Sequence, residues 1–483
     1  MADLLLRGAT VYDGTGAPPR RADVSVAEGR IAEIGDRLAT GAARVLEADG
    51  LALAPGFIDV HTHDDMAVLA PEGSLPKISQ GVTSVVIGNC GISAAPSPLA
   101  GRDAPVPPLD LLGEAAAFAF AGFGDYLAAL AAARPRVNVY PLVGHTTLRA
   151  RAMKRLDRPA TPGELRQMRA DLAEALAEGA AGISTGLAYP PAKAATTGEV
   201  AALAGDVAQA GGLWTTHMRD ERSGVVSAVA ETIDIARRSG ARTLISHHKC
   251  CGEAAYGLSH TTLAMIEEAR ESLSLDLDVY PYTASSTVLI ESFARDSRKV
   301  TVTWSDPHPE MNGRDLAEIA ADWGVDEMTA LARLRPGGAV YHQMEEDDLR
   351  RIMAYPPSLI GSDGLPRDRR PHPRLWGTFP RVLGHYARDE GVLTMEQAVA
   401  KMTGQTARVL GLSDRGRIAP GCAADLVLFD PAQVIDRADY DDPTQPAAGI
   451  VEVLVNGRTA WSAGACRGEG NGAILTGRNR QAA

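Results

Sequence analysis

The middle of the chain alternates short apolar runs with longer stretches in which apolar residues recur every three or four positions. The longer pattern is typical of amphipathic helices and the shorter runs of buried strands. Eight strands are predicted, over residues 57–63, 84–90, 137–145, 182–187, 213–218, 242–248, 273–282 and 358–364. Eight strand-helix units in one continuous stretch predict an α/β fold of the (β/α)8 TIM barrel type. The doubly wound alternative needs a Gly-rich phosphate loop after the first strand, and FIDVHTHDD has none.

Both ends of the chain follow a different pattern, of short alternating strands broken by turn residues. Examples are ADVSVAEGRIAEIG near the start and IVEVLVNGRTAW near the end. We expect residues 1–54 and 416–483 to form one small β-sandwich domain, and residues 55–415 to form the barrel. The seventh and eighth strands are separated by about 75 residues, more than one crossover helix requires. An inserted subdomain is therefore expected at about 284–345.

Composition narrows the class of function. The formal charge of −12 argues against non-specific binding of nucleic acid, which needs a basic face. No apolar run approaches the roughly 20 residues of a membrane span, and Arg7 interrupts the first apolar stretch, so neither a membrane segment nor a signal peptide is predicted. The five scattered cysteines favour free thiols in a reducing compartment. A cytoplasmic protein is expected, of an oligomeric state that the sequence does not indicate.

Side chains that bind metals or activate water stand at the ends of the predicted strands. In chain order they are His61, His63, Cys90, His145, Tyr189, His217, His247, Tyr280 and Asp363. The carboxyl ends of the strands of a (β/α)8 barrel converge on one face, where active sites of this fold are built. We therefore expect these residues to lie around a single site.

Three of these residues form a set suited to a zinc ion. Cys90, His217 and His247 offer one thiolate and two imidazoles, which leave a fourth position for water. His61 and His63 are two residues apart, so on a strand their side chains face the same way. Taken singly, an H-x-H pair can be two hydrogen-bonded core histidines, and Cys90 an inert buried thiol. Their joint occurrence at strand ends favours a metal site.

Amide hydrolysis at such a site also needs a base, and Asp363 in GSDG is the candidate. Asp-Gly is equally a common turn signal, which is the ordinary structural interpretation. The basic run at 367–374 would usually be a solvated loop. Because it follows Asp363 directly, one of its arginines is also a candidate to clamp a substrate carboxylate. His248, Cys250 and Cys251 are expected to be structural.

Several long motifs resemble one family over almost the whole chain. They are PGFIDVHTHDD, GVTSVVIGNCG, THMRDE, SHHKC, DVYPY, WSDPHPEMNGRD, IGSDGLPRDRRPHPRLWGTFPRVLG and PGCAADLVLFD. In these motifs the chain resembles the amidohydrolase superfamily and, within it, the N-acyl-D-amino-acid deacylases, or D-aminoacylases. Hydantoinase- and dihydroorotase-like members use a carboxylated lysine near the end of the fourth strand. The stretch GISTGLAY offers no lysine there.

The resemblance implies a metal arrangement. One zinc ion would be held tightly by Cys90, His217 and His247. His61 and His63 would form a second metal position that is weak or empty.

The resemblance also implies roles toward the substrate. Asp363 would be the general base, and His63 would help to stabilise the oxyanion. The α-carboxylate of the substrate would be bound by four residues, Lys249, Tyr189, Tyr280 and Arg374. The implied activity is hydrolysis of N-acyl-D-amino acids to a carboxylate and a free D-amino acid.

Two alternatives to this activity stay open at this point. One is hydrolysis of a cyclic amide by a hydantoinase- or dihydroorotase-like enzyme. The other is a non-catalytic scaffold that keeps the amidohydrolase fold. The sequence does not indicate the preferred amino-acid side chain, the acyl group or the number of metals.

Overall fold

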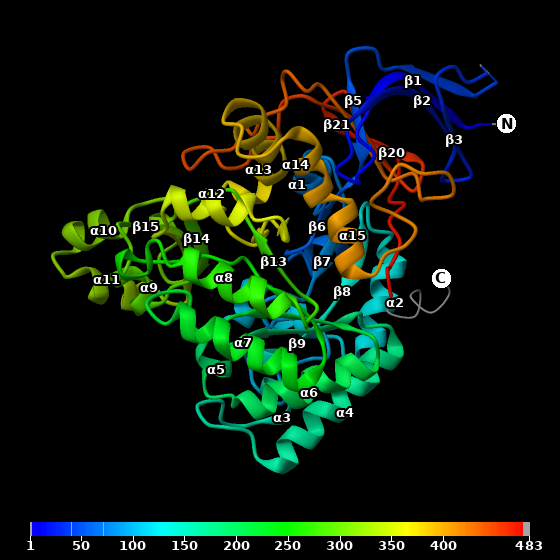
Figure 1. Cartoon of the computed structure of the whole chain (residues 1–483). Coiled ribbons are helices and arrows are strands. Elements are labelled where there is room, and N and C mark those ends of the chain that lie inside the picture. Colours follow the sequence, from blue (N-terminus) through cyan, green and yellow to red (C-terminus); the bar gives the residue numbers. More distant parts are fainter. Residues whose placement is uncertain (1, 40, 71, 477–483) are drawn as a thin grey trace.

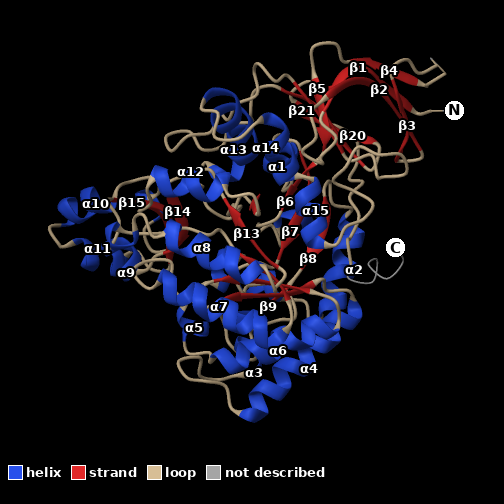
Figure 2. Cartoon of the chain, in the orientation of Figure 1, coloured by secondary structure: helices blue, strands red, loops and turns tan. Residues whose placement is uncertain are grey.

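The computed structural model describes residues 2–39, 41–70 and 72–476 (Figure 1). Parallel strands form the wall of a barrel with helices outside it (Figure 2). The strands are β6 (Phe57–Asp59), β7 (Val82–Ile87), β8 (Asn138–Pro141), β9 (Val143–Gly144), β10 (Gly182–Gly186), β11 (Leu213–His217), β12 (Arg242–Ile245), β13 (Leu275–Val279) and β17 (Ser358–Ile360). Each of the eight predicted strands is confirmed, with β8 and β9 as two parts of the third. Most are shorter than predicted because the polar residues at their ends lie in loops.

The order of the strands places the polar ends next to one another. β6, β7 and β8 pair in parallel, and so do β9, β10, β11, β12, β13 and β17 in that order. Leu142 alone separates β8 from β9, and a parallel bridge between Thr62 and Gly364 connects the chain after β6 with the chain after β17. The ring therefore closes, as the predicted barrel requires.

The sequences of the outer helices contain an apolar stripe that faces the barrel and residues that mark where each helix begins and ends. Thr161 caps α4 in a capping box with Glu164, and Gly179 ends it in a conformation that favours glycine. In α7, buried residues from Val225 to Ala236 recur every three or four positions and face the barrel. The main helices are α2 (Phe123–Ala133), α3 (His145–Ala152), α4 (Pro162–Glu178), α6 (Thr197–Gln209), α7 (Val225–Ser239), α8 (Ser259–Arg270), α12 (Glu346–Ala354), α13 (Arg374–Arg381), α14 (Met395–Met402) and α15 (Gly404–Leu410).

The two ends of the chain meet in one curled sheet beside the barrel (Figure 1). Antiparallel pairing of β5 with β18 joins the first part of the chain to the last. Alternate residues of these strands, such as Leu6, Val24 and Leu426, pack in a separate small core. The strands are β1 (Leu4–Val11), β2 (Arg20–Ala27), β3 (Arg30–Gly35), β4 (Arg44–Glu47), β5 (Ala52–Pro55), β18 (Leu426–Phe429), β19 (Ile450–Val455), β20 (Arg458–Ser462) and β21 (Ala465–Cys466).

An inserted unit lies between β13 and β17, as the long gap between these strands predicts. It contains a three-stranded antiparallel sheet in the order β14-β16-β15, with its own apolar core around Val302, Leu316 and Tyr341. Its elements are β14 (Ala284–Val288), α9 (Glu291–Arg295), β15 (Lys299–Ser305), α10 (Leu316–Trp323), α11 (Glu327–Arg333) and β16 (Gly337–His342).

The domain limits given above stay predictions, and residues 1 and 477–483 of the predicted small domain lie outside the described residues. Among the residues that the structure describes, no helix combines the length and the apolar character needed to cross a membrane.

Candidate metal centre and active site

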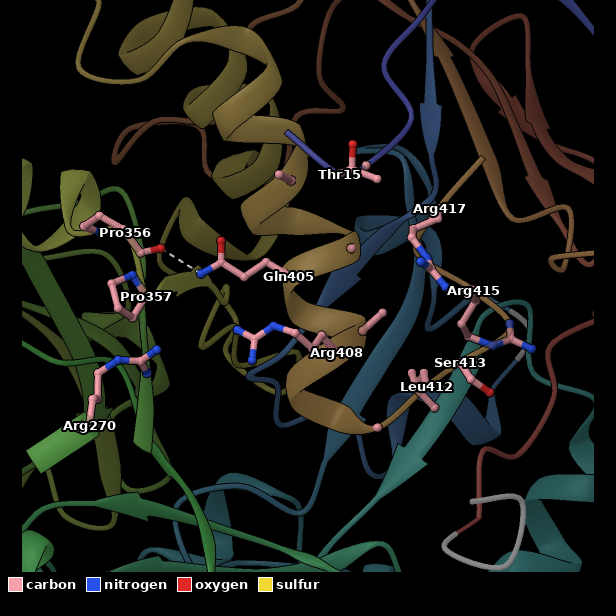
Figure 3. A pocket seen from close by; sticks show the side chains of 15 residues that line it. Thr15, Arg270, Pro356, Pro357, Gln405, Arg408, Leu412, Ser413, Arg415 and Arg417 are labelled. Atoms are coloured by element: carbon pink, nitrogen blue, oxygen red, sulfur yellow. Dashed lines mark hydrogen bonds between the residues drawn. The ribbon is translucent and has the colours of Figure 1, made fainter. Parts of the chain in front are cut away.

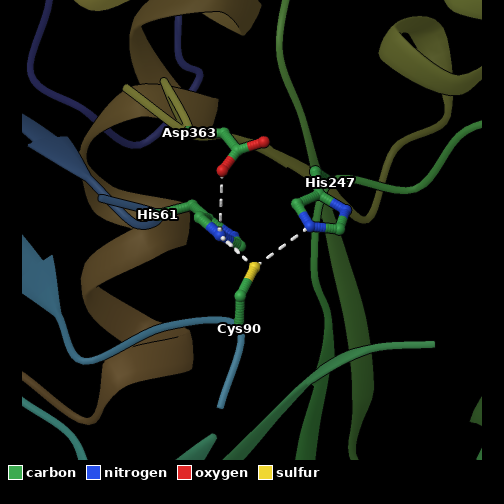
Figure 4. A group of neighbouring side chains, drawn as sticks. All are labelled: His61, Cys90, His247 and Asp363. Carbon is green, nitrogen blue, oxygen red and sulfur yellow. Dashed lines mark hydrogen bonds and ion pairs between the residues drawn. The ribbon is translucent and has the colours of Figure 1, made fainter. Parts of the chain in front are cut away.

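Four side chains from different strands converge at the carboxyl end of the barrel (Figure 4). The Cys90 Sγ lies 3.2 Å from the His61 Nε2 and 3.3 Å from the His247 Nε2. The Asp363 Oδ1 lies 3.4 Å from the same His61 nitrogen. All four side chains are buried. Sequence and structure therefore agree that the ends of β6, β7, β12 and β17 meet in one place.

His217 stands beside this group and completes the predicted thiolate-imidazole set. Its ring centroid lies 4.5 Å from that of His247, and with Glu221 these two histidines form a second group of candidate ligands. Both ring nitrogens of His217 are buried without a hydrogen-bond partner. Buried imidazole nitrogens normally have a partner, so this vacancy in the hydrogen bonding fits a metal ligand. A sulfur and two imidazoles are donors that suit Zn²⁺.

The backbone of the site is held in an unusual conformation. Cys90, His247 and Asp363 all have positive φ angles, of 51°, 35° and 52°. This left-handed region is costly for residues with a side chain, at roughly 1–3 kcal/mol each, and such residues cluster at functional sites. Each of the three sits where the chain leaves a barrel strand, so the sharp turn aims its side chain into the barrel mouth.

Charges inside the cluster set the protonation states of its members. Burial alone would raise the pKa of the Cys90 thiol, but His61 and His247 hold it well below its usual range. Burial would likewise raise the pKa of Asp363, yet Arg374, His247 and His61 keep it well below its usual range. Burial would lower the pKa of His63, but its hydrogen bond with Asp363 raises it to about 9. These shifts favour the ionised forms of Cys90 and Asp363 and the protonated form of His63.

A buried network of hydrogen bonds positions His61 and Asp363. The Asp59 Oδ1 accepts from the backbone N–H groups of Ser362, at 2.8 Å, and His61, at 3.3 Å. Lys77 donates to the Asp59 Oδ2 at 2.9 Å and to the Ser362 Oγ at 2.7 Å. The loops after β6 and β17 are thus tied together directly below the cluster.

Glu221 is a site residue that the sequence reasoning missed. Its carboxylate lies 3.0 Å from the His247 Nδ1 and accepts a hydrogen bond of 2.7 Å from the Lys249 Nζ. Glu221 also lies 3.4 Å from the His217 Nε2. It therefore orients the His247 imidazole, fixes the ammonium group of Lys249 and places a negative charge beside His217. The signal in the sequence was its place four residues after His217, in THMRDE.

Asp278, on β13, was also missed. One of its oxygens accepts from the backbone N–H of His247 at 2.9 Å, and the other lies 3.4 Å from the His61 Nδ1. A carboxylate inside the apolar strand LDLDV was the available signal, because buried carboxylates require partners.

Arg374 is buried in the site and is not part of a solvated loop. It begins α13, with no exposed surface, and its Nη1 lies 2.8 Å from the Asp363 Oδ2. The guanidinium carbon lies 4.6 Å from the centre of the Tyr280 ring, and the Lys249 Nζ lies 5.7 Å from the same centre. The hydroxyl of Tyr280 is buried without a partner. Tyr280 thus lies between two cationic side chains, of which Arg374 contacts Asp363.

Tyr189 connects the cluster with the inserted unit. Its ring lies 4.9 Å from that of His217, and its hydroxyl lies 3.0 Å from the Thr287 Oγ1 on β14. It lies near Arg374, whose Nη2 donates to the backbone carbonyl of Ser286, the residue next to Thr287.

The expectation that His145 joins the site is wrong. His145 begins α3, and its Nε2 lies 2.9 Å from the Glu199 Oε1. Arg149 also donates to Glu199, and all three groups are buried. The third strand ends at Gly144, so the following helix turns His145 away from the barrel mouth.

This network yields a prediction for folding stability. Burial would raise the pKa of Glu199, but His145 and Arg149 lower it to about 2, from 4.5. Such a shift corresponds to about 3 kcal/mol of stability. Since the folded-state pKa is depressed, this contribution is complete above pH 4.5 and is lost as the pH falls through about 2. We expect Glu199→Gln to lower the free energy of unfolding at pH 7 by about this amount.

Urea denaturation at pH 7 and at about pH 3 checks this expectation. The difference between Glu199→Gln and the unchanged protein should shrink by about half at the lower pH. Glu174→Gln, on the exposed face of α4, is the matched control and should change little at either pH. An equal difference at both values would show that charge at Glu199 is not the cause.

The three residues expected to be structural lie outside the cluster. The His248 Nε2 lies 2.9 Å from the Thr262 Oγ1. Cys250 and Cys251 are buried free thiols, and burial raises the pKa of Cys250 to about 12.

A cavity of about 720 Å³ lies at the other end of the barrel and has no part in this cluster (Figure 3). Its walls include Arg270 and Pro356, which come shortly before β13 and β17 and so mark the amino ends of the strands. In this fold the chemistry is carried by the carboxyl ends.

Comparisons with known proteins agree with the fold and with the site. The amidohydrolase family pattern matches residues 44–460. The chain is 50% identical to a D-aminoacylase of Alcaligenes xylosoxydans xylosoxydans, over 98% of this chain and 97% of that protein. It is 51% identical to an N-acyl-D-glutamate deacylase of the same organism, over 94% and 93%.

A solved structure extends the comparison to three dimensions. It is an N-acyl-D-glutamate deacylase of Bordetella bronchiseptica, complexed with zinc and a phosphonate inhibitor that mimics the tetrahedral intermediate of the reaction. The TM-score is 0.94 at 48% identity, over 98% of this chain and 99% of that one. Fold and site thus define a hydrolase barrel of the metal-dependent kind. The chain belongs to the amidohydrolase family and, within it, to the D-aminoacylases and N-acyl-D-amino-acid deacylases.

Proposed function

We propose that the protein is a zinc-dependent deacylase that hydrolyses N-acyl-D-amino acids to a carboxylate and a free D-amino acid. The observation that carries this proposal is the meeting of the Cys90 thiolate and the His247 imidazole with the Asp363 carboxylate in one buried cluster. Relatives that are about half identical over nearly their whole length include a D-aminoacylase and deacylases for N-acyl-D-glutamate and N-acyl-D-aspartate.

The zinc ion would be held by Cys90, His217 and His247, with His61 and His63 at a second, weaker position. The vacant ring nitrogens of His217 and the lowered pKa of the Cys90 thiol support this assignment. When bound, zinc supplies a Lewis acid that lowers the pKa of a coordinated water to about 7.

Asp363 would act as the general base and then as the general acid. Its carboxylate is ionised at neutral pH because Arg374, His247 and His61 oppose the effect of burial. It can therefore take a proton from the attacking water and deliver it to the leaving amine. When the second metal position is empty, His63, 3.1 Å from the Asp363 Oδ1, would donate to the oxyanion of the substrate.

The substrate α-carboxylate would be bound by Lys249, Tyr280, Arg374 and Tyr189. The Arg374 Nε and the Tyr280 hydroxyl have no hydrogen-bond partner and match a carboxylate, whereas Lys249, which is hydrogen-bonded to Glu221 and His247, would have to exchange one of these partners to bind it. With the carboxylate and the scissile carbonyl both fixed, only one direction at Cα has room for a side chain. That constraint would select the D-enantiomer.

The two alternatives have less support. β10, the fourth barrel strand, consists of Gly182–Gly186 with the sequence GISTG, so no lysine stands there to bridge two metals. A scaffold that has lost activity would be expected to have lost ligands. The candidate ligands and the base are all present and clustered.

The test is the rate of hydrolysis of N-acetyl-D-amino acids against their L-enantiomers, with zinc-loaded protein. We expect the kcat/KM for the D-form to exceed that for the L-form by at least about 100-fold for side chains such as that of methionine. Equal rates for both enantiomers, or hydrolysis of hydantoins alone, would contradict the proposal.

A further inference from the structure

A cavity of about 460 Å³ opens beside His63; its lining includes Leu375 and Trp376, which follow Arg374 on α13, but neither Lys249 nor Tyr280. We call it the acyl cavity. His63 is at its inner end, and its walls come from the chain after β6, the chain near residue 111 and the chain after β17. Its volume falls in the range of small-molecule sites, which is roughly 300–1,000 Å³.

The walls of the acyl cavity are mainly apolar. The side chains that line it include Met66, Leu75, Leu111, Leu112, Leu375 and Trp376. Leu111 and Leu112 also belong to a buried apolar cluster that contains Cys90, Tyr189 and Leu365. Apolar surface thus continues from the proposed metal ligand into the cavity. Four ionisable side chains also line the cavity. Glu72 and Arg369 are exposed, and Asp368 is buried. Arg367 donates a hydrogen bond to the backbone carbonyl of Asp110.

The position of the acyl cavity relative to Lys249 and Tyr280 gives a direction for the substrate. Lys249 follows β12, which is across the ring from β7, and Tyr280 follows β13. The cavity is bordered instead by segments that follow β6, β7 and β17. A substrate with its carboxylate near Lys249 and its scissile carbonyl beside Asp363 extends its acyl group past His63.

We propose that the acyl cavity binds the acyl chain of the substrate, so that unbranched fatty acyl groups of medium length are better substrates than acetyl. This inference rests on the proposed function. Burying a charged or strongly polar acyl group against Met66, Leu75 and Leu111 would cost free energy, so these parts of the wall favour an apolar chain. The hydrophobic gain from each methylene that leaves water is about 0.8 kcal/mol, which corresponds to about fourfold in kcat/KM.

The experiment measures kcat/KM for N-acetyl-, N-butanoyl- and N-hexanoyl-D-methionine with the zinc-loaded, full-length protein. We expect a rise of at least about tenfold from acetyl to hexanoyl. If acetyl is hydrolysed but the rate is flat or falls with chain length, the acyl cavity does not bind the chain. If the protein hydrolyses N-acetyl-D-glutamate or N-acetyl-D-aspartate instead, the same three acyl groups are compared on that amino acid. If no N-acyl-D-amino acid is hydrolysed, the proposed function itself fails.

Substitutions of cavity residues test whether the preference for longer acyl chains arises in the acyl cavity. Met66→Lys places a charge on a half-buried wall residue and is expected to lower the hexanoyl-to-acetyl ratio at least about fivefold. Leu75→Lys makes the same change on another part of the wall and is expected to have the same effect. Met265→Lys, at a half-buried position on α8 outside the cavity, is the matched control and should keep the original ratio.

Two further results would overturn the inference. One is an unchanged ratio in folded Met66→Lys and Leu75→Lys proteins. The other is a loss of discrimination among amino-acid side chains, such as alanine against methionine, with the ratio for acyl chains unchanged. That second result would assign the cavity to the amino-acid side chain.

Discussion

Replacing Asp363 with asparagine is expected to lower kcat by about 10³-fold while the zinc content stays the same. An amide keeps the size of the carboxylate but cannot accept a proton from the attacking water. Asparagine also tolerates the left-handed backbone at this position, where φ is 52°, so the fold should be retained. Steady-state kinetics with zinc-loaded protein and metal analysis of the same sample provide the measurement.

The control for this variant is Asp234→Asn on the outer face of α7, where the aspartate forms an exposed ion pair with Arg238. Its kcat should equal that of the unchanged protein. A folded Asp363→Asn protein that loses zinc as well would assign Asp363 a role in metal binding. Full activity in that variant would remove Asp363 from the chemistry altogether.

Replacing Cys90 with serine is expected to release the metal and to abolish turnover. A serine hydroxyl is a much poorer ligand for Zn²⁺ than a thiolate, and the neighbouring imidazoles hold the pKa of the Cys90 thiol well below its usual range. We expect less than about a tenth of the original zinc after dialysis, and a fall in activity of at least about 10³-fold.

Cys422→Ser is the matched control, since Cys422 is also a buried free thiol but packs in the small core of the curled sheet. It should retain both zinc and activity. If Cys90→Ser kept one tightly bound zinc per chain, the assignment of the tight site to Cys90, His217 and His247 would be wrong.

The barrel fold was predictable because the strand-helix pattern occurs eight times along the chain. Eight apolar runs separated by amphipathic stretches indicate a barrel even though single boundaries shift by several residues. Most strands end earlier in the structure than the sequence predicts, and they do so for one reason. β6 ends at Asp59, for example, whereas the apolar and polar residues up to His63 read as a continuing strand. The residues that connect a strand to the active site have a composition like that of the strand, but they do not form the hydrogen bonds of the sheet.

The residues that meet at the strand ends were also predictable, because each strand contributes a ligand-type side chain at the same end. Site residues that come from positions other than the strand ends were not predictable from the sequence. Glu221 stands in a loop rich in charged residues, and only the folded chain brings its carboxylate to His247 and Lys249. The burial of Arg374 depends on how α13 packs, which the basic run at 367–374 does not encode locally. The prediction for His145 was wrong for a different reason. The helix α3 begins at His145, where the strand pattern ended.

The central claim is that one zinc ion is bound by a sulfur and two imidazoles opposite Asp363. X-ray absorption at the zinc edge, on protein loaded with one zinc ion per chain, tests this claim most directly. The account predicts one sulfur at about 2.3 Å and two imidazole nitrogens at about 2.0 Å, with the sulfur signal absent in Cys90→Ser. A first coordination sphere of nitrogen and oxygen alone in the unchanged protein would contradict it.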